Sequence, residues 1–449
     1  MTMGIEAIFL DVGETSLLTA GRQFFEKENV YPIVELFRRG YRLGIVSSGA
    51  SGVDVKGILR EPKIAGCFET IVTGRSQFSL ADLQEAAVQM NVAVDRCAYI
   101  CLTGDEQLAS ARSVGFSIIQ DCRLDNLPRL LEMFPPRPAP QPAVVYDASL
   151  STMYAINNFP SLVDFFEFGR RMGFARSELN HKVTSEMLTG INLDDYSISS
   201  VHEPCPADIG EDELKRRDWL ISSLEEDCRA AGVRAMMRSI DIASQVGAGT
   251  VVVHAGQVVP DTAILEKQLR DLVYADQSGT EAFRAINARM RAIRAENAEA
   301  GFASVMKSIR ELLAYAEPLG ICLGIENRYH YLEYPSPDEL GILLRLAGPD
   351  RIGFIFDIGH AETLDRLGFF PKATWLERFA DRIVGTHLHD IVSTTDHYAP
   401  GLGSADFQTV AAYLPEQAFR TCELQTFNGP EQVKAGLDFL ARQGCIRKL

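Results

Sequence analysis

Residues 143–449 alternate short apolar runs with amphipathic segments, and this alternation restricts the fold more than any other feature of the chain. Eight runs have the length and composition of buried strands: 143–149, 174–181, 196–203, 250–256, 322–327, 352–360, 383–390 and 421–427. Helical periodicity fills the gaps between them. Eight strand–helix repeats over about 300 residues predict a (β/α)8 TIM barrel, in which the carboxyl ends of all strands face one site.

Side chains that can bind metals collect where these predicted strands end. All eight histidines of the chain follow residue 142, and seven lie in or just after a strand candidate: His181, His202, His254, His360, His387, His389 and His397. Carboxylates end strands too: Glu326, Asp357, Asp390 and Glu423. Buried carboxylates and imidazoles that converge on one site would repel one another or be desolvated unless a cation held them. The pattern therefore predicts a metal site, although Asp390 could instead cap the following turn.

The first third of the chain predicts a second, smaller α/β domain. Apolar runs at 5–12, 41–48, 69–74, 96–104 and 116–121 alternate with helical segments. Such alternation predicts a doubly wound parallel sheet. Five prolines in residues 135–142 cannot continue a helix and predict a linker. The expected organisation is therefore a domain at 1–134, a linker at 135–142 and a barrel at 143–449.

Composition narrows the class of partner. The net charge of −16 does not favour sequence-independent binding of nucleic acid, which needs a broad basic surface. The N-terminus has no secretory signal, and no apolar run approaches the roughly 20 residues of a membrane helix. Nine cysteines without a CxxC pair indicate reduced thiols in a cytoplasmic protein. We expect a small-molecule substrate and no membrane or nucleic-acid partner, and a homo-oligomer is compatible with the sequence.

Two motifs of the first third, FLDVGET and GIVSSG, resemble those of the haloacid dehalogenase-like (HAD) fold. The resemblance implies that Asp11 is the nucleophile and that Ser47 binds phosphate. Gly13, however, stands in place of the acid/base Asp, and Asp105 matches the last acidic motif poorly. An aspartyl-phosphate mechanism needs a proton donor and Mg²⁺ carboxylates. The resemblance therefore implies a HAD-like domain that is catalytically degenerate.

The motifs GIEN, FDIGHA, HLHD with DHYAPGLGSADF, and CELQ resemble the xylose isomerase-like TIM barrels. That superfamily contains sugar isomerases, epimerases and the endonuclease IV type of apurinic-site nuclease. The resemblance implies a core divalent metal ion (Mn²⁺, Zn²⁺, Co²⁺ or Mg²⁺) with four ligands: Glu326, Asp357, His387 and Glu423. His360 completes the D-x-x-H pair, and it would contact substrate or bind an extra metal.

Three further histidines match ligands of the extra metals in endonuclease-type sites: His202, His254 and His397. Those sites have an Asp two residues before the last of these histidines. Here Thr395 occupies that position and Asp396 is displaced by one residue. The displacement places the third metal of such a cluster in question.

The resemblance assigns proton transfer to Glu326 and Glu423, with His360 as a third catalytic candidate. A metal ion that polarises a carbonyl, flanked by two carboxylates, can move a proton on the adjacent carbon. We expect a divalent-metal-dependent isomerase or epimerase of a small keto-sugar, polyol or related hydroxy-carbonyl compound. Two alternatives stay open. One is a multi-metal phosphoesterase of endonuclease IV type, acting on a small phosphate ester or an apurinic site. The other is a non-catalytic partner-binding module.

The segment 257–305 is a long insertion before the strand that ends in Glu326. Helical spacing places Arg284, Arg291 and Arg294 roughly on one side of it. These arginines could form a solvated helix face, or they could belong to a lid that clamps an anionic substrate.

Overall fold

The computed structural model describes residues 4–11, 27–47, 55, 59, 63–73, 80–101, 105–119, 131–137, 142–154, 158–259 and 263–449. The chain forms two compact units. One comprises residues 1–143, 155–172 and 429–434, and the other comprises residues 144–154, 173–428 and 435–449. The larger unit contains the barrel strands.

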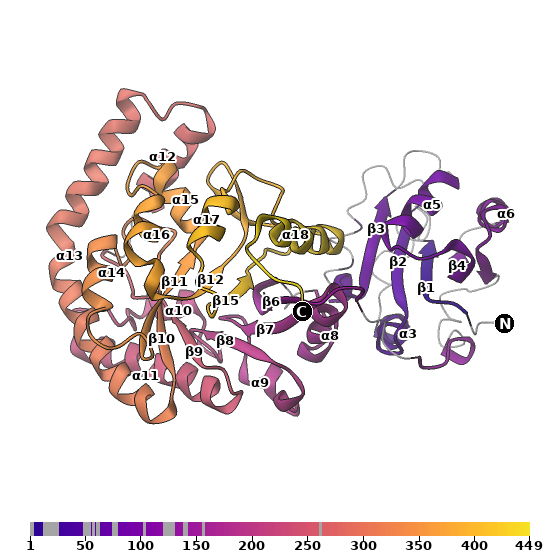
Figure 1. The fold of residues 1–449 in the computed structure, drawn as a ribbon, viewed down its shortest axis with the longest axis horizontal. Helices are drawn as coiled ribbons and strands as arrows, with labels where there is room; N and C mark the ends of the chain where they lie inside the picture. The colour runs from indigo at the N-terminus through magenta and orange to yellow at the C-terminus, as the bar shows by residue number, and fades with distance from the viewer. Residues whose placement is uncertain are drawn as a thin grey trace. The chain divides into compact units, whose positions relative to one another are not determined.

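Eight parallel strands close into a barrel (Figure 1), as the sequence predicts. The strands are β6 (Tyr146–Ser151), β7 (Phe174–Leu179), β8 (Ile198–His202), β9 (Thr250–Val253), β10 (Cys322–Glu326), β11 (Ile352–Asp357), β12 (Ile383–His387) and β15 (Phe419–Cys422). Each strand pairs with the next along the chain, and β15 closes the ring by pairing with β6. The strands are apolar because both faces are buried, and the three valines of β9 have no exposed surface.

All eight barrel strands differ from the predicted runs by a few residues at one or both ends, and two of the differences bear on the site. The run predicted at 383–390 ends as β12 at His387, and an antiparallel hairpin of β13 (Asp390–Val392) and β14 (Thr395–Tyr398) follows. The last barrel strand lies two residues earlier than predicted and ends at Cys422. Glu423 therefore follows its strand directly, as a residue at the barrel mouth.

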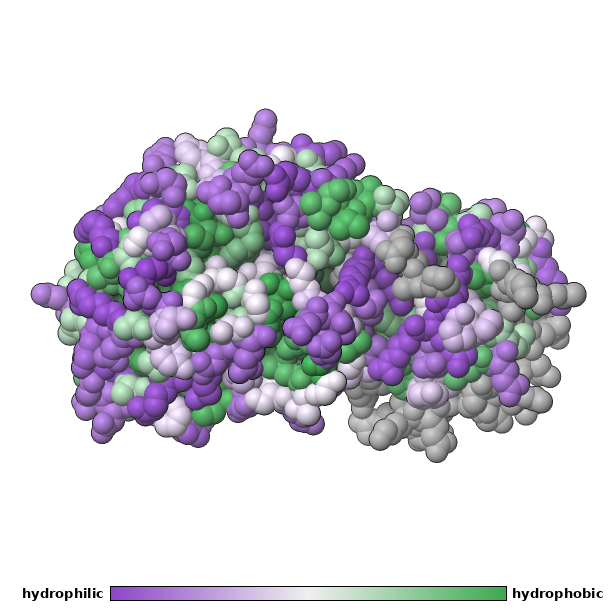
Figure 2. Space-filling view, turned by 60° about the horizontal axis from the view of Figure 1, so that its bottom comes forward, coloured by the Kyte–Doolittle hydropathy of each residue, from purple (hydrophilic) through white to green (hydrophobic). Residues whose placement is uncertain are grey.

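Helices follow the strands and surround the barrel (Figure 1). They are α9 (Ser185–Leu188), α10 (Glu211–Arg216), α11 (Glu226–Gln245), α12 (Ala263–Tyr274), α13 (Glu281–Ala316), α14 (Pro337–Leu343), α15 (Ile358–Arg366), α16 (Ala373–Phe379), α17 (Phe407–Tyr413) and α18 (Pro430–Gln443). None of the helices in the described ranges is both long and apolar enough for a membrane span. On the face shown in Figure 2, hydrophobic residues form separate patches among hydrophilic ones.

The insertion after β9 forms α12 and the 36-residue helix α13. The arginines of α13 point at protein carbonyls. Arg294 donates to the carbonyl oxygens of Tyr331 at 2.7 Å and of Glu333 at 2.9 Å, and Arg291 donates to that of Phe369 at 3.2 Å. Both guanidinium groups therefore hold α13 to neighbouring loops, which argues against the anion clamp. Arg294 is buried, whereas Arg284 and Arg291 are exposed, as a solvated helix face predicts.

The smaller unit contains the parallel sheet that the sequence predicts. Its strands are β1 (Ala7–Asp11), β2 (Arg42–Ser47), β3 (Phe68–Thr73), β4 (Cys97–Cys101) and β5 (Ser117–Ile119), in the order β3-β2-β1-β4-β5. Its helices are α3 (Lys27–Arg38), α5 (Leu80–Gln89), α6 (Asp105–Val114) and α8 (Leu162–Met172). Asp164 of α8 pairs with Arg38 at 2.9 Å, and Arg171 donates to the carbonyl oxygen of Phe37 at 2.6 Å.

The residues that carry the HAD resemblance are described only in part. Asp11 ends the central strand β1, is fully buried and accepts a 2.5 Å hydrogen bond from the hydroxyl of Tyr99. Gly13 and the side chains of Ser47 and Asp105 lie outside the described part of the chain.

Candidate metal centre

Four carboxylates surround the imidazole of His387 at the carboxyl end of the barrel. Its Nδ1 atom lies 2.6 Å from Glu326, 3.2 Å from Glu423 and 3.6 Å from Asp357. Its Nε2 atom lies 3.2 Å from Glu178. None of these side chains exposes more than 4% of its surface. The strand ends thus gather the four predicted core ligands, and they add a fourth carboxylate that the sequence analysis missed.

The four carboxylates are buried together. The guanidinium of Arg328 donates to Glu326 at 2.8 Å, and further imidazoles contact the cluster: His254 beside Glu326, His389 beside Asp357 and His397 beside Glu423. Imidazoles offset carboxylate charge only when they are protonated, so a bound cation would lower the cost of burying these carboxylates together. Candidate donor atoms of the four predicted core ligands all lie within 4.8 Å of one another. This donor set of carboxylates and one imidazole fits a divalent metal ion.

The attraction between the carboxylates and His387 shifts the pKa values of these groups. Burial disfavours the charged form of each group, but mutual attraction outweighs burial. The carboxylates of Glu423, Glu178 and Glu326 raise the pKa of His387 well above its ordinary value. In turn, His387 together with a hydrogen bond from His254 holds the pKa of Glu326 well below its ordinary value. The pKa of Glu423 is likewise held well below its ordinary value, chiefly by His387. Glu326 and Glu423 are therefore ionised and able to accept a cation or a proton from a bound molecule.

A second group of donors adjoins the first and shares Glu326 and His387 with it. His202 ends β8, and its Nε2 atom lies 3.9 Å from Glu326. Its Nδ1 atom lies 2.8 Å from the carbonyl oxygen of Glu203 and must donate there, because a carbonyl only accepts. The Nε2 atom is therefore the donor atom that faces the centre. His254, a predicted ligand that belongs to none of the donor groups, follows β9 and places Nε2 at 2.9 Å from Glu326.

A third group comprises His360, Asp396 and His397. Asp396 Oδ1 lies 2.8 Å from His397 Nδ1, and its Oδ2 atom lies 3.8 Å from His360 Nε2. That Oδ2 atom is buried and has no hydrogen-bond partner among the described residues. His360 Nδ1 donates to the carbonyl oxygen of Asn327 at 2.9 Å, which leaves Nε2 as the available donor atom.

The backbone explains how Asp396 joins this group despite its displacement in the sequence. Neighbouring strand residues normally point to opposite faces. His397 has a φ of +61°, in the left-handed region, which breaks this alternation. Asp396 and His397 therefore face the same point, and the spacing that the sequence analysis questioned does not separate them.

Two other residues of the HLHD motif support the centre and belong to none of the three donor groups. His389 Nδ1 accepts the backbone N–H of His397 at 3.0 Å, so its Nε2 carries the proton that it donates to Asp357 at 3.0 Å. Asp390 accepts three backbone N–H groups, those of residues 391, 401 and 405. Asp390 therefore shapes the loop after β12, as its capping alternative predicted.

Glu178 is the residue that sequence reasoning missed. It lies near the end of β7 and is fully buried. Besides His387, its Oε2 atom accepts the hydroxyl of Ser200 at 2.7 Å, while Oε1 has no hydrogen-bond partner within the described ranges. A charged residue inside the otherwise buried run FARSELNH was the available signal. The eighth histidine, His330, pairs with Glu266 at 2.9 Å and lies outside all three groups.

An eight-stranded parallel barrel with carboxylates and imidazoles at its carboxyl end defines a TIM barrel with a candidate metal centre. A model of the family described as xylose isomerase-like TIM barrel matches residues 192–443, more than half of the chain. The chain belongs to this family. The predicted superfamily is thereby confirmed for the barrel, whereas the HAD-like resemblance of the first 134 residues stays a prediction.

Individual relatives are distant. A protein of Sinorhizobium fredii, described as uncharacterized, is 23% identical over 259 residues, which cover 57% of this chain and 68% of that protein. A D-tagatose 3-epimerase-like protein of known structure is 20% identical, with a TM-score of 0.45 and coverage of 66% of this chain and 96% of that chain. The 3-keto-D-glucoside 4-epimerase of E. coli is 15% identical, with a TM-score of 0.45 and coverage of 66% and 99%.

Proposed function

We propose that the barrel is a divalent-metal-dependent isomerase or epimerase of a small keto-sugar, polyol or related hydroxy-carbonyl compound. One observation carries the proposal. The carboxylates of Glu326 and Glu423 both contact the same atom, His387 Nδ1, at distances of 2.6 Å and 3.2 Å. Two ionised carboxylates at one buried point are what proton removal and return at a single carbon require.

The proposed metal ligands are Glu326, Asp357, His387 and Glu423. When bound, a divalent ion there would polarise the carbonyl of the substrate. Glu326 ends β10 and Glu423 follows β15, and two strands of the ring separate these positions. The two carboxylates therefore reach the centre from different directions. We propose that one takes the proton next to the carbonyl and that the other returns it, with His360 contacting the substrate.

Deuterium exchange tests this proposal directly. The metal-loaded protein is incubated in D₂O with a panel of small ketoses, and label on the carbon next to the carbonyl is followed by mass spectrometry. We expect incorporation that Glu326→Gln and Glu423→Gln each reduce by at least about 100-fold, the scale of general acid–base catalysis. Glu416→Gln, at a side chain that is 80% exposed, serves as the matched control. Exchange that survives in both active-site variants would contradict the assignment.

A multi-metal phosphoester hydrolase is the second candidate, and the three donor groups favour it. Glu326 belongs to two of these groups, as a carboxylate that bridges adjacent metals does. Elemental analysis of the purified protein and cleavage of bis(p-nitrophenyl) phosphate separate the candidates. Two or three ions per chain, together with diester cleavage and no deuterium exchange, would establish the hydrolase. No bound ion and no rescue by Mn²⁺ or Co²⁺ would instead favour the non-catalytic module.

We also propose that residues 1–134 form a HAD-like scaffold without aspartyl-phosphate chemistry, joined to the barrel of residues 143–449 by residues 135–142. The position of Asp11 at the end of the central strand supports the scaffold. The full chain is assayed with p-nitrophenyl phosphate and Mg²⁺. We expect no turnover above that of Asp11→Asn. Turnover that Asp11→Asn abolishes but Glu326→Gln retains would show that the smaller unit is a live phosphatase.

A further inference from the structure

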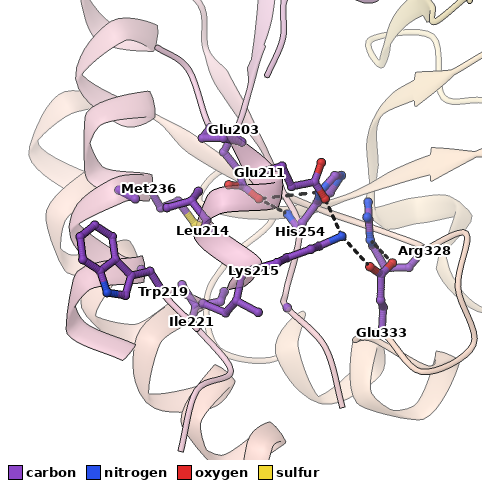
Figure 3. A pocket seen from close by; sticks show the side chains of 15 residues that line it. Glu203, Glu211, Leu214, Lys215, Trp219, Ile221, Met236, His254, Arg328 and Glu333 are labelled. Atoms are coloured by element: carbon purple, nitrogen blue, oxygen red, sulfur yellow. Dashed lines mark hydrogen bonds and ion pairs between the residues drawn. The ribbon is translucent and has the colours of Figure 1, made fainter. Parts of the chain in front are cut away.

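A pocket that is partly open to solvent lies between α10 and the loop after β10 (Figure 3). Its polar side chains are Glu203, Glu211, Lys215, His254, Arg328 and Glu333. Two of them join the pocket to the metal centre, because His254 and Arg328 contact Glu326 at 2.9 Å and 2.8 Å. A molecule in this pocket therefore lies next to a proposed catalytic carboxylate.

Both cations in the pocket are already paired. Lys215 Nζ lies 2.8 Å from Glu211 and 3.4 Å from Glu333. Arg328 contacts Glu333 through Nε at 3.1 Å and Glu326 through its other end. Figure 3 shows these ion pairs as a chain that runs across the pocket. Arg328 and Glu333 are each only 7% exposed, so their charges are poorly screened by water.

The carboxylates of the pocket outnumber its cations. Burial favours the neutral form of Glu333, but Arg328, His330 and Lys215 outweigh it and lower the pKa of Glu333 to about 2. Glu211 and Glu333 pair with Lys215 and Arg328, and Glu203 is a third carboxylate of the lining.

The opposite wall is apolar, with Leu214, Trp219, Ile221 and Met236 among its lining residues. An apolar wall facing a few fixed polar groups is the usual composition of a site for a small organic molecule. Such a wall covers the C–H face of a ligand while the polar chain binds its hydroxyl groups.

We propose that this pocket binds the uncharged, polyhydroxylated part of the substrate and excludes phosphorylated molecules. The inference rests on the proposed isomerase or epimerase function and specifies its substrate class. A hydroxyl donates to Glu211 or Glu333 and accepts from Lys215 or Arg328 without changing the net charge. A phosphate would have to displace a carboxylate from one of the two cations and remain beside the others, which costs Coulomb energy in a site of low solvent access.

Binding measurements on the metal-loaded full chain test the substrate class. The probes are D-fructose, D-tagatose, D-psicose and D-sorbose, each compared with its own 6-phosphate by ligand-observed NMR and calorimetry. We expect at least one neutral ketose to bind tenfold or more tightly than its phosphate. Equal or tighter binding of the phosphates would overturn the inference, and so would the absence of binding by every neutral ketose.

Two variants locate the binding in this pocket. Glu333→Gln removes a carboxylate and frees part of both cations, so we expect the preference for neutral ketoses to fall at least threefold. Lys215→Met, at a side chain that is 35% exposed, keeps the fold intact and should weaken neutral ligands. Glu317→Gln, on an exposed ion pair, is the control. Neutral binding that both pocket variants leave unchanged would refute the site.

The outcome is separable from that of the proposed function. Neutral ketoses that bind in the pocket but show no deuterium exchange would refute the isomerase or epimerase chemistry and leave the pocket assignment standing. Deuterium exchange on a phosphorylated ketose in preference to the neutral one would refute the pocket assignment and leave the isomerase or epimerase chemistry standing.

Discussion

Single side chains decide what the centre can bind, and Glu178 is the first of them. It is the only carboxylate in contact with Nε2 of His387 among the described residues, and this contact turns Nδ1 toward the proposed ligand group. A carboxylate behind a metal-binding imidazole fixes its orientation and raises its basicity.

We expect Glu178→Gln to weaken divalent metal binding by about 10- to 100-fold, as for other outer-sphere partners of ligand histidines. Competition of the purified protein with a coloured chelator measures this affinity without any assay of activity. Glu167→Gln, on a surface ion pair with Arg170, is the matched control. An unchanged affinity would show that Glu178 does not orient His387 for metal binding.

The pairing of Glu333 with Arg328 and Lys215 should make the stability of the protein depend on pH in the acidic range. Because its folded-state pKa of about 2 lies below the ordinary value of 4.5, Glu333 stabilises the fold fully above about pH 4.5. This contribution, about 3 kcal/mol by linkage, is lost as the pH falls toward 2.

The comparison is made with Glu333→Gln, whose melting temperature is measured against that of the wild type from pH 6 to pH 2. The variant should be less stable at pH 6, and the difference should shrink as the pH falls below 4.5. A difference that stays constant over this range would mean that Glu333 does not carry its charge in the folded protein.

At the scale of elements, buried charge adds to the apolar contacts that hold α13 in the fold. Arg294 is 6% exposed, donates to two backbone carbonyls and also pairs with Glu339 at the start of α14. A helix 36 residues long is held in place by tertiary contacts of both kinds, because propensity alone gives little stability.

We expect Arg294→Met to lower the free energy of unfolding by about 2–4 kcal/mol, because several buried acceptors lose their donor. Urea denaturation measures the change. The matched control is Arg284→Met on the same helix, whose guanidinium bonds the exposed carbonyl of Gly279 and whose loss should cost under about 0.5 kcal/mol. Similar losses of unfolding free energy in both variants would argue that Arg294 does not hold α13 to the loops.

For the molecule as a whole, the burial of several carboxylates at one point predicts that metal stabilises the fold. A ligand present at 100 times its dissociation constant adds about 2.7 kcal/mol to the folded state. Removal of metal with a chelator should therefore lower the melting temperature of the barrel measured by calorimetry, and Mn²⁺, Co²⁺ or Zn²⁺ should restore it. Glu423→Gln should reduce this difference. A melting temperature that is indifferent to metal would count against the centre.

The sequence by itself determined the barrel and most of the candidate centre. Apolar runs of strand length separated by helical periods fit few folds, and in a parallel barrel the last residues of the strands must converge. Glu326, Asp357, His387 and His202 are the final residues of their strands, so a linear pattern was enough to bring them together.

The tertiary structure decided what lies between and behind those strand ends. The positive φ of His397 brings Asp396 into a donor group, and no spacing rule contains that angle. The role of Glu178 depends on its contact with His387 across the barrel, and the role of Arg294 depends on its hydrogen bonds to carbonyl oxygens of another loop. The pocket beside α10 likewise depends on Lys215 and Arg328, which are distant in sequence and share one carboxylate. Periodicity reports which face of an element is buried, whereas pairing between side chains depends on distances that only the folded chain sets.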